Sequence, residues 1–143
     1  MIELDGNPAR LDLARVHGWL ASSYWSPGIE RALLERAIAG SHPLGAYDHS
    51  GQVGFARAIT DYATFAWIAD VWVAEEHRGK GLGRRMVSWF VDHTRLAGIR
   101  RIGLTTADAH GVYAKLGFTA LHRPDRYMER LSPEALALLK AAS

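Results

Sequence analysis

A basic, glycine-rich segment in the middle of the chain has the residue types that hold phosphate groups. It follows an apolar stretch ending at Val73 and leads into a run with helical spacing from Leu82. Glycines at every second position (Gly79, Gly81 and Gly83) let an anion approach the backbone amides closely. The helix N-terminus would add the positive end of its dipole, and four basic residues would add charge: Arg78, Lys80, Arg84 and Arg85. The segment therefore predicts a pyrophosphate cradle; the alternative is a strand-to-helix turn with solvated basic side chains.

The glycine spacing differs from that of the commoner phosphate-binding motifs. A Walker loop requires a hydroxyl residue after Gly-Lys, and a Rossmann fingerprint requires G-x-G-x-x-G. The order Arg-Gly-x-Gly-x-Gly, between an apolar strand and an apolar helix, resembles the acetyl-CoA pyrophosphate loop of the GNAT superfamily of acetyl-CoA-dependent N-acyltransferases. The resemblance implies acetyl-CoA as co-substrate, with these residues binding it: Arg78, Gly79, Lys80, Gly81, Leu82, Gly83 and Arg84.

A second motif lies downstream, where Tyr113 precedes the pair Gly117-Phe118 by four residues. This resembles the GNAT signature in which a helix carries a tyrosine before a Gly-Phe turn. The resemblance runs from about residue 45 to residue 128 and points to a bacterial-type branch. The chain departs from the pattern at Thr106, where many GNAT proteins have an asparagine that contacts the pantetheine arm. We therefore assign Thr106 no side-chain contact with the pantetheine arm.

Acetyl transfer from a thioester to an amine needs a neutral amine, a donor for the oxyanion and a proton for the leaving thiolate. The resemblance implies direct transfer with both substrates bound together. It makes Tyr113 the candidate general acid, the alternative being a packed tyrosine. It also implies that backbone amides of Val71, Trp72 and Val73 face the pantetheine and the thioester carbonyl, on a strand that splays from its neighbour. The Trp72 side chain either borders the acyl or acceptor site or belongs to the core.

The general base and the acceptor pocket are less closely defined by the sequence. Asp70 lies in an apolar strand, where a charge needs compensation or a purpose. It is either a catalytic or substrate-binding group or a structural partner in a hydrogen bond or ion pair. By analogy with the superfamily, the segment between the first two helices should line the acceptor pocket through Tyr24, Trp25 and Ser26, joined by Tyr62. Such aromatic side chains suit a cationic amine; the alternative is a hydrophobic plug over the sheet.

The order of elements predicts an α/β fold of the α+β type. We expect one domain over residues 1–143, with a central mixed, largely antiparallel sheet flanked by helices, the order that a GNAT domain implies. The expected helices start at the Asn7-Pro8 cap and cover 30–39, 82–97, 109–116 and a short run after 133. The expected strands cover 44–47, 53–59, 64–73, 99–104, 118–121 and 126–131.

Composition narrows the functional classes. The chain has 143 residues, a formal net charge of +2 and no cysteine, which argues against nucleic-acid binding, an acyl-cysteine intermediate and a cysteine-based metal site. No apolar run reaches the length of a membrane span, so a cytoplasmic protein is expected. We also expect no metal ion. The predicted partner is an amine acceptor, a small molecule or a peptide, and the resemblance leaves a homodimer open. The alternative function is a non-catalytic acyl-CoA-binding sensor or interaction module.

Overall fold

The computed structural model describes residues 1–92 and 95–142, and its centre is a five-stranded sheet in the order β1-β2-β3-β4-β5. Neighbouring strands are antiparallel except for β4 and β5, which are parallel. This confirms the predicted mixed, largely antiparallel sheet. The strands are β1 Glu3–Asp5, β2 His42–Asp48, β3 Gly51–Thr60, β4 Ala66–Val73 and β5 Ile102–Gly103.

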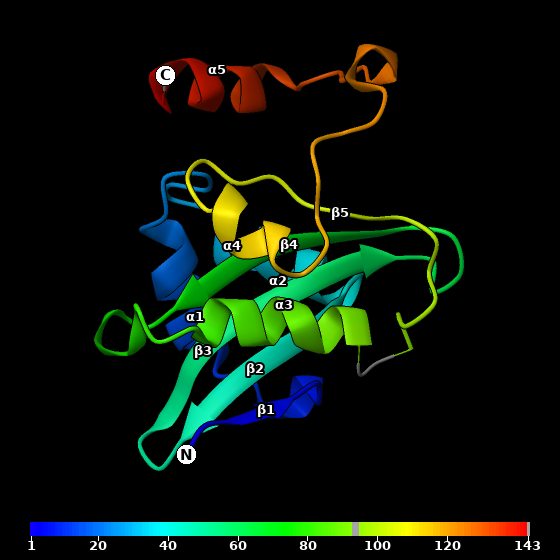
Figure 1. Ribbon diagram of the computed structural model, residues 1–143. Helices are drawn as coiled ribbons and strands as arrows, with labels where there is room; N and C mark the ends of the chain where they lie inside the picture. Colours follow the sequence, from blue (N-terminus) through cyan, green and yellow to red (C-terminus); the bar gives the residue numbers. More distant parts are fainter. Residues whose placement is uncertain (93–94, 143) are drawn as a thin grey trace.

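Helices cover both faces of the sheet (Figure 1). Apolar residues of α1 (Leu13–Ala21) and α2 (Arg31–Ala39) form one buried cluster with Phe55 of β3. On the other face, α3 (Leu82–Asp92) buries Met86, Val87 and Phe90 against apolar residues of β2, β3 and β4. Two further helices follow, α4 (His110–Ala114) and α5 (Pro133–Ala142). Within the described ranges, no helix has both the length and the apolar character needed to cross a membrane.

The predicted elements up to β4 form with shifted ends. Residues 30–39 and both strands of the hairpin are where alternation and helical spacing placed them. The first helix begins later than expected, because Asn7 caps only a 3-10 turn at Pro8–Arg10. The N-cap of α1 is Asp12, whose carboxylate accepts a hydrogen bond from the Arg15 amide at 3.1 Å. Helix α3 is described to Asp92; His93 and Thr94 of its expected continuation lie outside the described residues, and 95–98 form a turn.

The two final strands expected at 118–121 and 126–131 are not formed, so this part of the prediction is wrong. The strand expected at 99–104 is also reduced to two residues, which pair with Ala66 and Trp67 of β4. A strand needs a neighbour's backbone along its length, and a two-residue β5 offers little of it. Pro124 opens a 3-10 turn that extends to Arg126, the first residue of the second expected strand. The chain after Phe118 instead runs away from the sheet to α5 (Figure 1).

Gly18 provides a simple test of helix α1. It is exposed within the helix, and a Cβ built on it meets nothing within 4 Å. Gly18→Ala is expected to raise the free energy of unfolding by about 1 kcal/mol, because alanine loses less backbone entropy in a helix. Urea denaturation followed by far-UV circular dichroism would measure the change. An unchanged or lower stability would mean that α1 is not helical at this position in solution.

Candidate active site

The site is built around a β-bulge in β4. Phe55 pairs with Trp72 and Arg57 pairs with Ala69, so Ala56 alone faces two residues of β4, one of which is Asp70. Asp70 has a φ of 58°, in the left-handed region that aspartate tolerates better than most residues. Bulges of this kind bend a strand and re-aim a side chain, and they are common beside active sites.

Beyond the bulge, one side of β4 is open. Strand β5 pairs only with Ala66 and Trp67, so in the described structure the segment Val71–Val73 has no strand partner on that side. Backbone groups on that side are available to a ligand, except the Val73 carbonyl, which accepts a hydrogen bond from Arg78 Nε. The resemblance predicted a strand open at this point; that its amides face the pantetheine and the thioester stays a prediction. The side chains alternate as expected: Val71 and Val73 pack against the α3-side core, whereas Trp72 packs against the α1/α2-side core.

A cavity of about 370 Å³ lies at this open end of β4. It joins three segments that the sequence analysis treated separately: the loop after α1, the end of β4 and the first residue of the glycine-rich loop. Its volume is within the range of small-molecule sites. The lining residues are Ser22, Ser23, Tyr24, Trp25, Val71, Trp72, Val73 and Arg78.

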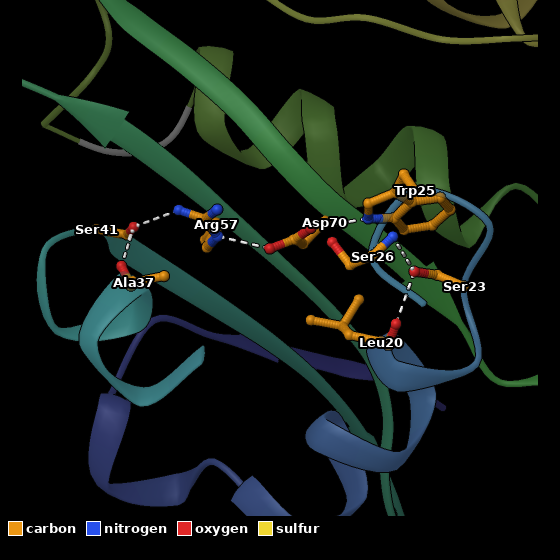
Figure 2. Close-up of polar contacts among 8 residues, drawn as sticks. All are labelled: Leu20, Ser23, Trp25, Ser26, Ala37, Ser41, Arg57 and Asp70. Atoms are coloured by element: carbon orange, nitrogen blue, oxygen red, sulfur yellow. Dashed lines mark hydrogen bonds and ion pairs between the residues drawn. The ribbon is translucent and has the colours of Figure 1, made fainter. Parts of the chain in front are cut away.

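A chain of polar contacts holds Trp25 over the bulge (Figure 2). The Trp25 indole N–H donates to Asp70 Oδ1 at 2.9 Å, and Arg57 Nε donates to Asp70 Oδ2 at 2.7 Å. Arg57 Nη1 also donates to Ser41 Oγ at 2.9 Å, and that hydroxyl donates to the Ala37 carbonyl at the end of α2. The Arg57 and Asp70 side chains are 15% and 9% exposed. Of the alternatives for Asp70, the structure contains the ion pair.

The sequence analysis missed Arg57. It belongs to β3, whose other residues from Gln52 to Ala58 are buried. A lone arginine in such a strand requires a buried or half-buried acid, and Asp70 was the lone acid of the next strand. Pairing these two charges between the predicted strands 53–59 and 64–73 was the available signal.

The loop after α1 presents two aromatic rings to the cavity. Tyr24 is 62% exposed and meets Trp25 edge-on at 5.0 Å between ring centroids. The ring centroid of Trp25 in turn lies 6.0 Å from that of Trp72. Ser23 turns the loop: its hydroxyl donates to the Leu20 carbonyl at 2.7 Å and accepts from the Ser26 amide at 3.0 Å. Ser26 itself is absent from the cavity lining.

Tyr62 does not join this site, which corrects its expected place in the acceptor pocket. It lies in the turn before β4, at the opposite end of the strand from Val71–Val73. Asp61 organises that turn by accepting hydrogen bonds from the amides of the next residues and from the Thr64 hydroxyl. Tyr62 has a φ of 61°, and its hydroxyl pairs with His42 Nδ1 at 3.0 Å. The Tyr62 ring packs beside that of His42, and Tyr62 is not among the residues that line the cavity.

The glycine-rich loop has the backbone that its sequence predicted. Gly79 and Gly81 have φ values of 78° and 82°, which residues other than glycine rarely adopt. A Cβ on Gly83 would lie 3.9 Å from methyl groups of Val71 and Val73, so the first turn of α3 packs closely on the open end of β4. Arg84 lines a second cavity of about 300 Å³ beside α3, with Leu4, Arg85, Ser88, Trp89 and Leu116.

Arg78 connects the loop to the strand. Its Nε donates to the Val73 carbonyl at 2.9 Å, and its guanidinium lies 5.0 Å from the centre of the Trp72 ring. The guanidinium thus places a positive charge at the rim of the cavity. On the preceding turn, His77 Nε2 lies 3.1 Å from Asp48 Oδ2. These contacts fix the start of the loop against β4 and the β2–β3 turn.

Tyr113 lies on α4 and is half-buried against the α3-side core, with its ring 6.2 Å from that of Phe118. Burial, and secondly the charge of Asp108, raise the pKa of the Tyr113 phenol above its ordinary value. The phenol is therefore protonated at neutral pH. Tyr113 is not among the residues that line the larger cavity. In the described part of the chain, no group of three or more His, Asp or Glu side chains could hold a metal ion.

Gly81→Val tests the loop geometry. A β-branched residue at a φ near 80° costs about 1–3 kcal/mol, so the loop should change shape. The affinity for acetyl-CoA, the co-substrate that the resemblance implies, should then fall by about tenfold or more. Isothermal titration calorimetry with acetyl-CoA would measure this. Gly18→Ala, in α1 and outside the loop, is the matched control and should bind as the wild type does. Equal acetyl-CoA affinity in both variants would mean that the loop does not take part in binding.

The fold and the open strand beside a glycine-rich loop have the architecture of the acyltransferase class that the sequence resembled. Residues 11–118 match the model of the acetyltransferase (GNAT) family. The chain therefore belongs to this family.

Solved structures and a curated relative agree with this assignment. A GNAT-family protein of Xanthomonas campestris is 40% identical, with a TM-score of 0.88 over 93% of this chain and 94% of that one. A Clostridium acetobutylicum protein, solved with acetyl-CoA, shares the fold at a TM-score of 0.67, with 16% identity over 92% of this chain and 96% of its own. FG08082 of Gibberella zeae, which bears an acetyltransferase name, is 39% identical over 67 residues, 45% of this chain and 37% of that protein. The match thus spans little more than a third of the fungal relative.

Proposed function

We propose that this GNAT protein transfers an acetyl group from acetyl-CoA directly to a primary amine of a small molecule or a peptide. The observation that carries the proposal is the shared cavity at the open end of β4. There Val71–Val73, which has no strand partner on the β5 side, lines one space together with the aromatic loop at Tyr24 and Trp25 and with Arg78 of the glycine-rich loop. A thioester bound along β4 would have its phosphates at the loop and its acyl group beside the aromatic rings.

In the proposed reaction, the neutral amine attacks the thioester carbonyl carbon and forms the C–N bond. Backbone amides of the open strand would donate to the developing oxyanion, where fixed dipoles are most effective. The oxyanion then re-forms the carbonyl as the C–S bond breaks, and the CoA thiolate takes a proton from Tyr113. The amine nitrogen loses its proton to solvent or a base, and the Tyr113 phenolate regains a proton from solvent. The pKa of the phenol, raised by burial, keeps that proton available at neutral pH.

The aromatic rings support an amine as the acceptor. Tyr24 and Trp25 offer ring faces at the rim of the cavity, and such faces attract ammonium groups while the amine approaches. We assign Asp70 a positioning role, because both of its carboxylate oxygens are engaged, by the Trp25 indole and the Arg57 guanidinium. Through that bond Asp70 would set the orientation of Trp25 rather than remove the amine's proton.

A CoA-release assay with acetyl-CoA and a panel of amines tests the proposal. The panel should include polyamines, amino acids, aminoglycosides and short peptides with free N-termini or lysines. We expect thiol release that depends on one class of acceptor, with mass spectrometry finding the acetyl group on its nitrogen. Acetyl-CoA binding without turnover on any amine would favour the alternative, an acyl-CoA-binding sensor, and acetylation of a hydroxyl would replace the amine assignment.

A further inference from the structure

The side chain of Arg78 lies on the α1/α2 side of the sheet. Its guanidinium is 5.0 Å from the centre of the Trp72 ring, and Trp72 packs against the cluster that α1 and α2 form with β3. Arg84, from the same glycine-rich motif, lines the smaller cavity beside α3, on the other face of the sheet. The resemblance assigned both arginines to acetyl-CoA, but the structure places their side chains on opposite faces.

Arg78 determines the charge of the larger cavity. Among the described residues that line this cavity there is no aspartate or glutamate, and Arg78 is the single cation. Asp70 bonds to Trp25 but does not line the cavity, and its charge is paired with that of Arg57. An acceptor with several ammonium groups would therefore meet a positive charge with no carboxylate to offset it.

The two terminal nitrogens of Arg78 are available to a ligand. Nε donates to the Val73 carbonyl at 2.9 Å, whereas in the described part of the chain no hydrogen bond or ion pair engages Nη1 or Nη2. The bond to Val73 and the contact with the Trp72 ring hold the guanidinium at the rim of the cavity. A guanidinium held in this way suits a carboxylate, which it binds through two parallel hydrogen bonds.

Other polar side chains of the cavity wall are engaged within the protein. The hydroxyls of Ser22 and Ser23 each donate to a backbone carbonyl at 2.7 Å, and the Trp25 indole donates to a carboxylate of β4. Among the described side-chain donors of the lining, this leaves the Arg78 guanidinium and the Tyr24 hydroxyl. An acceptor would thus meet one cation and several aromatic ring faces.

The position of Arg78 also limits the distance between the amine and the anionic group of an acceptor. Because Nε bonds to the Val73 carbonyl, the guanidinium lies at the end of the segment along which the proposed reaction places the thioester. An amine that attacks there would reach the guanidinium with an acid group only a few bonds away. An α-amino acid has this spacing, and the rings of Tyr24 and Trp25 suit an apolar or aromatic side chain.

We propose that the acceptor is a free amino acid with an apolar or aromatic side chain, whose carboxylate binds the Arg78 guanidinium. This inference rests on the proposed acetyl transfer and names the class of its acceptor. The bonds and protons change as in that reaction, so the products are the N-acetylamino acid and CoA, and the carboxylate is unchanged. Arg78 is then a residue that determines acceptor specificity, and its side chain is not part of the pyrophosphate cradle.

Phenylalanine and phenylalaninamide are matched probes, because they differ in the carboxylate charge and little in shape. We expect a CoA-release assay with acetyl-CoA to give a higher kcat/KM for phenylalanine. Arg78→Gln should lower this preference by about 10–100-fold, the usual effect of losing a hydrogen bond to a charged group. Differences in amine basicity cancel when the two proteins are compared. Arg78→Lys keeps the charge without the planar fork, and it should retain part of the preference.

Arg84→Gln is the matched control, because it removes the same charge from the same motif on the other face of the sheet. It should keep the wild-type preference for phenylalanine, while calorimetric titration should show a larger loss of acetyl-CoA affinity than in Arg78→Gln. Both arginines are exposed, so the fold should be intact in each variant, which far-UV circular dichroism would check. An unchanged preference in Arg78→Gln, or an equal loss in both variants, would overturn the inference.

A titration without turnover distinguishes this inference from the proposed function. NMR of the protein–CoA complex should show tighter binding of phenylalanine than of phenylalaninamide, and Arg78→Gln should remove the difference. Turnover of amines with no preference for the carboxylate would overturn the amino-acid acceptor and leave the acetyl transfer standing. If no amine were acetylated, the proposed function would fail, whereas binding of phenylalanine through Arg78 would still support a carboxylate site in this cavity.

Discussion

Replacing Tyr113 with phenylalanine is expected to lower kcat for acetyl transfer by about 10²–10⁴-fold, the usual contribution of a positioned general acid. Phenylalanine keeps the ring that packs against the core and against Phe118. Acetyl-CoA affinity and thermal stability should therefore stay at wild-type values. Steady-state kinetics on the acceptor found in the amine panel, with calorimetric titration of acetyl-CoA, would measure both quantities.

The pH profile gives a second readout of the same variant. Because burial raises the pKa of Tyr113, the protonated acid persists above the ordinary tyrosine value near 10. The alkaline loss of kcat in the wild type should accordingly begin above that value and disappear in Tyr113→Phe. The free energy of unfolding changes with pH in the same direction. The contribution of the buried neutral phenol is complete at pH values below the pKa of Tyr113 in the unfolded chain. It is lost as the pH rises through the higher pKa of Tyr113 in the folded protein.

Tyr127→Phe is the control for removing a phenol elsewhere. Tyr127 is exposed in the segment before α5, and its hydroxyl contacts only Arg101 among the described hydrogen bonds. Its kcat should equal that of the wild type. If Tyr113→Phe also kept its full kcat, the thiolate would leave without this acid, and the half-buried tyrosine would be a packing residue of α4.

Local features of the chain were predictable from the sequence because their causes are local. The left-handed φ values at Gly79 and Gly81 follow from the residue type and the strand-to-helix turn. The hairpin of β2 and β3 follows from alternation about a short polar turn, and α2 ends at Gly40 as expected. The backbone conformation of the glycine-rich loop could therefore be predicted before any tertiary contact was known, whereas its contacts with acetyl-CoA stay a prediction.

Features that depend on distant residues were not predictable in the same way. The bulge at Asp70 exists because β3 and β4 differ by one residue in length between two paired positions. The bond from Trp25 to Asp70 joins residues 45 positions apart. Tyr62 was misplaced because its position depends on the turn before β4, where its amide donates to Thr60 Oγ1, and on a positive φ, not on its distance along the chain. The absent final strands depend on what β5 can pair with.

Arg57→Ala is expected to destabilise the folded protein by about 3–5 kcal/mol, because it leaves a largely buried carboxylate without its cation. Asp70 is 9% exposed at its side chain and accepts Arg57 Nε at 2.7 Å. The variant also removes the bond to Ser41, and so disconnects α2 from the bulge. Urea denaturation at neutral pH would measure the loss. With Trp25 less firmly held, KM for the acceptor should rise more than kcat falls.

The double-mutant cycle with Asp70→Asn separates the charge from the shape. Asparagine keeps an acceptor for the Trp25 indole and tolerates the φ of 58° at this position. Without the carboxylate charge, the further change Arg57→Ala should cost at least 1 kcal/mol less than it does in the wild type. Additive losses would mean that the guanidinium acts through Ser41 and its own packing. A non-zero coupling energy would instead place the ion pair at the centre of the bulge, as the element that holds Trp25 at the mouth of the cavity.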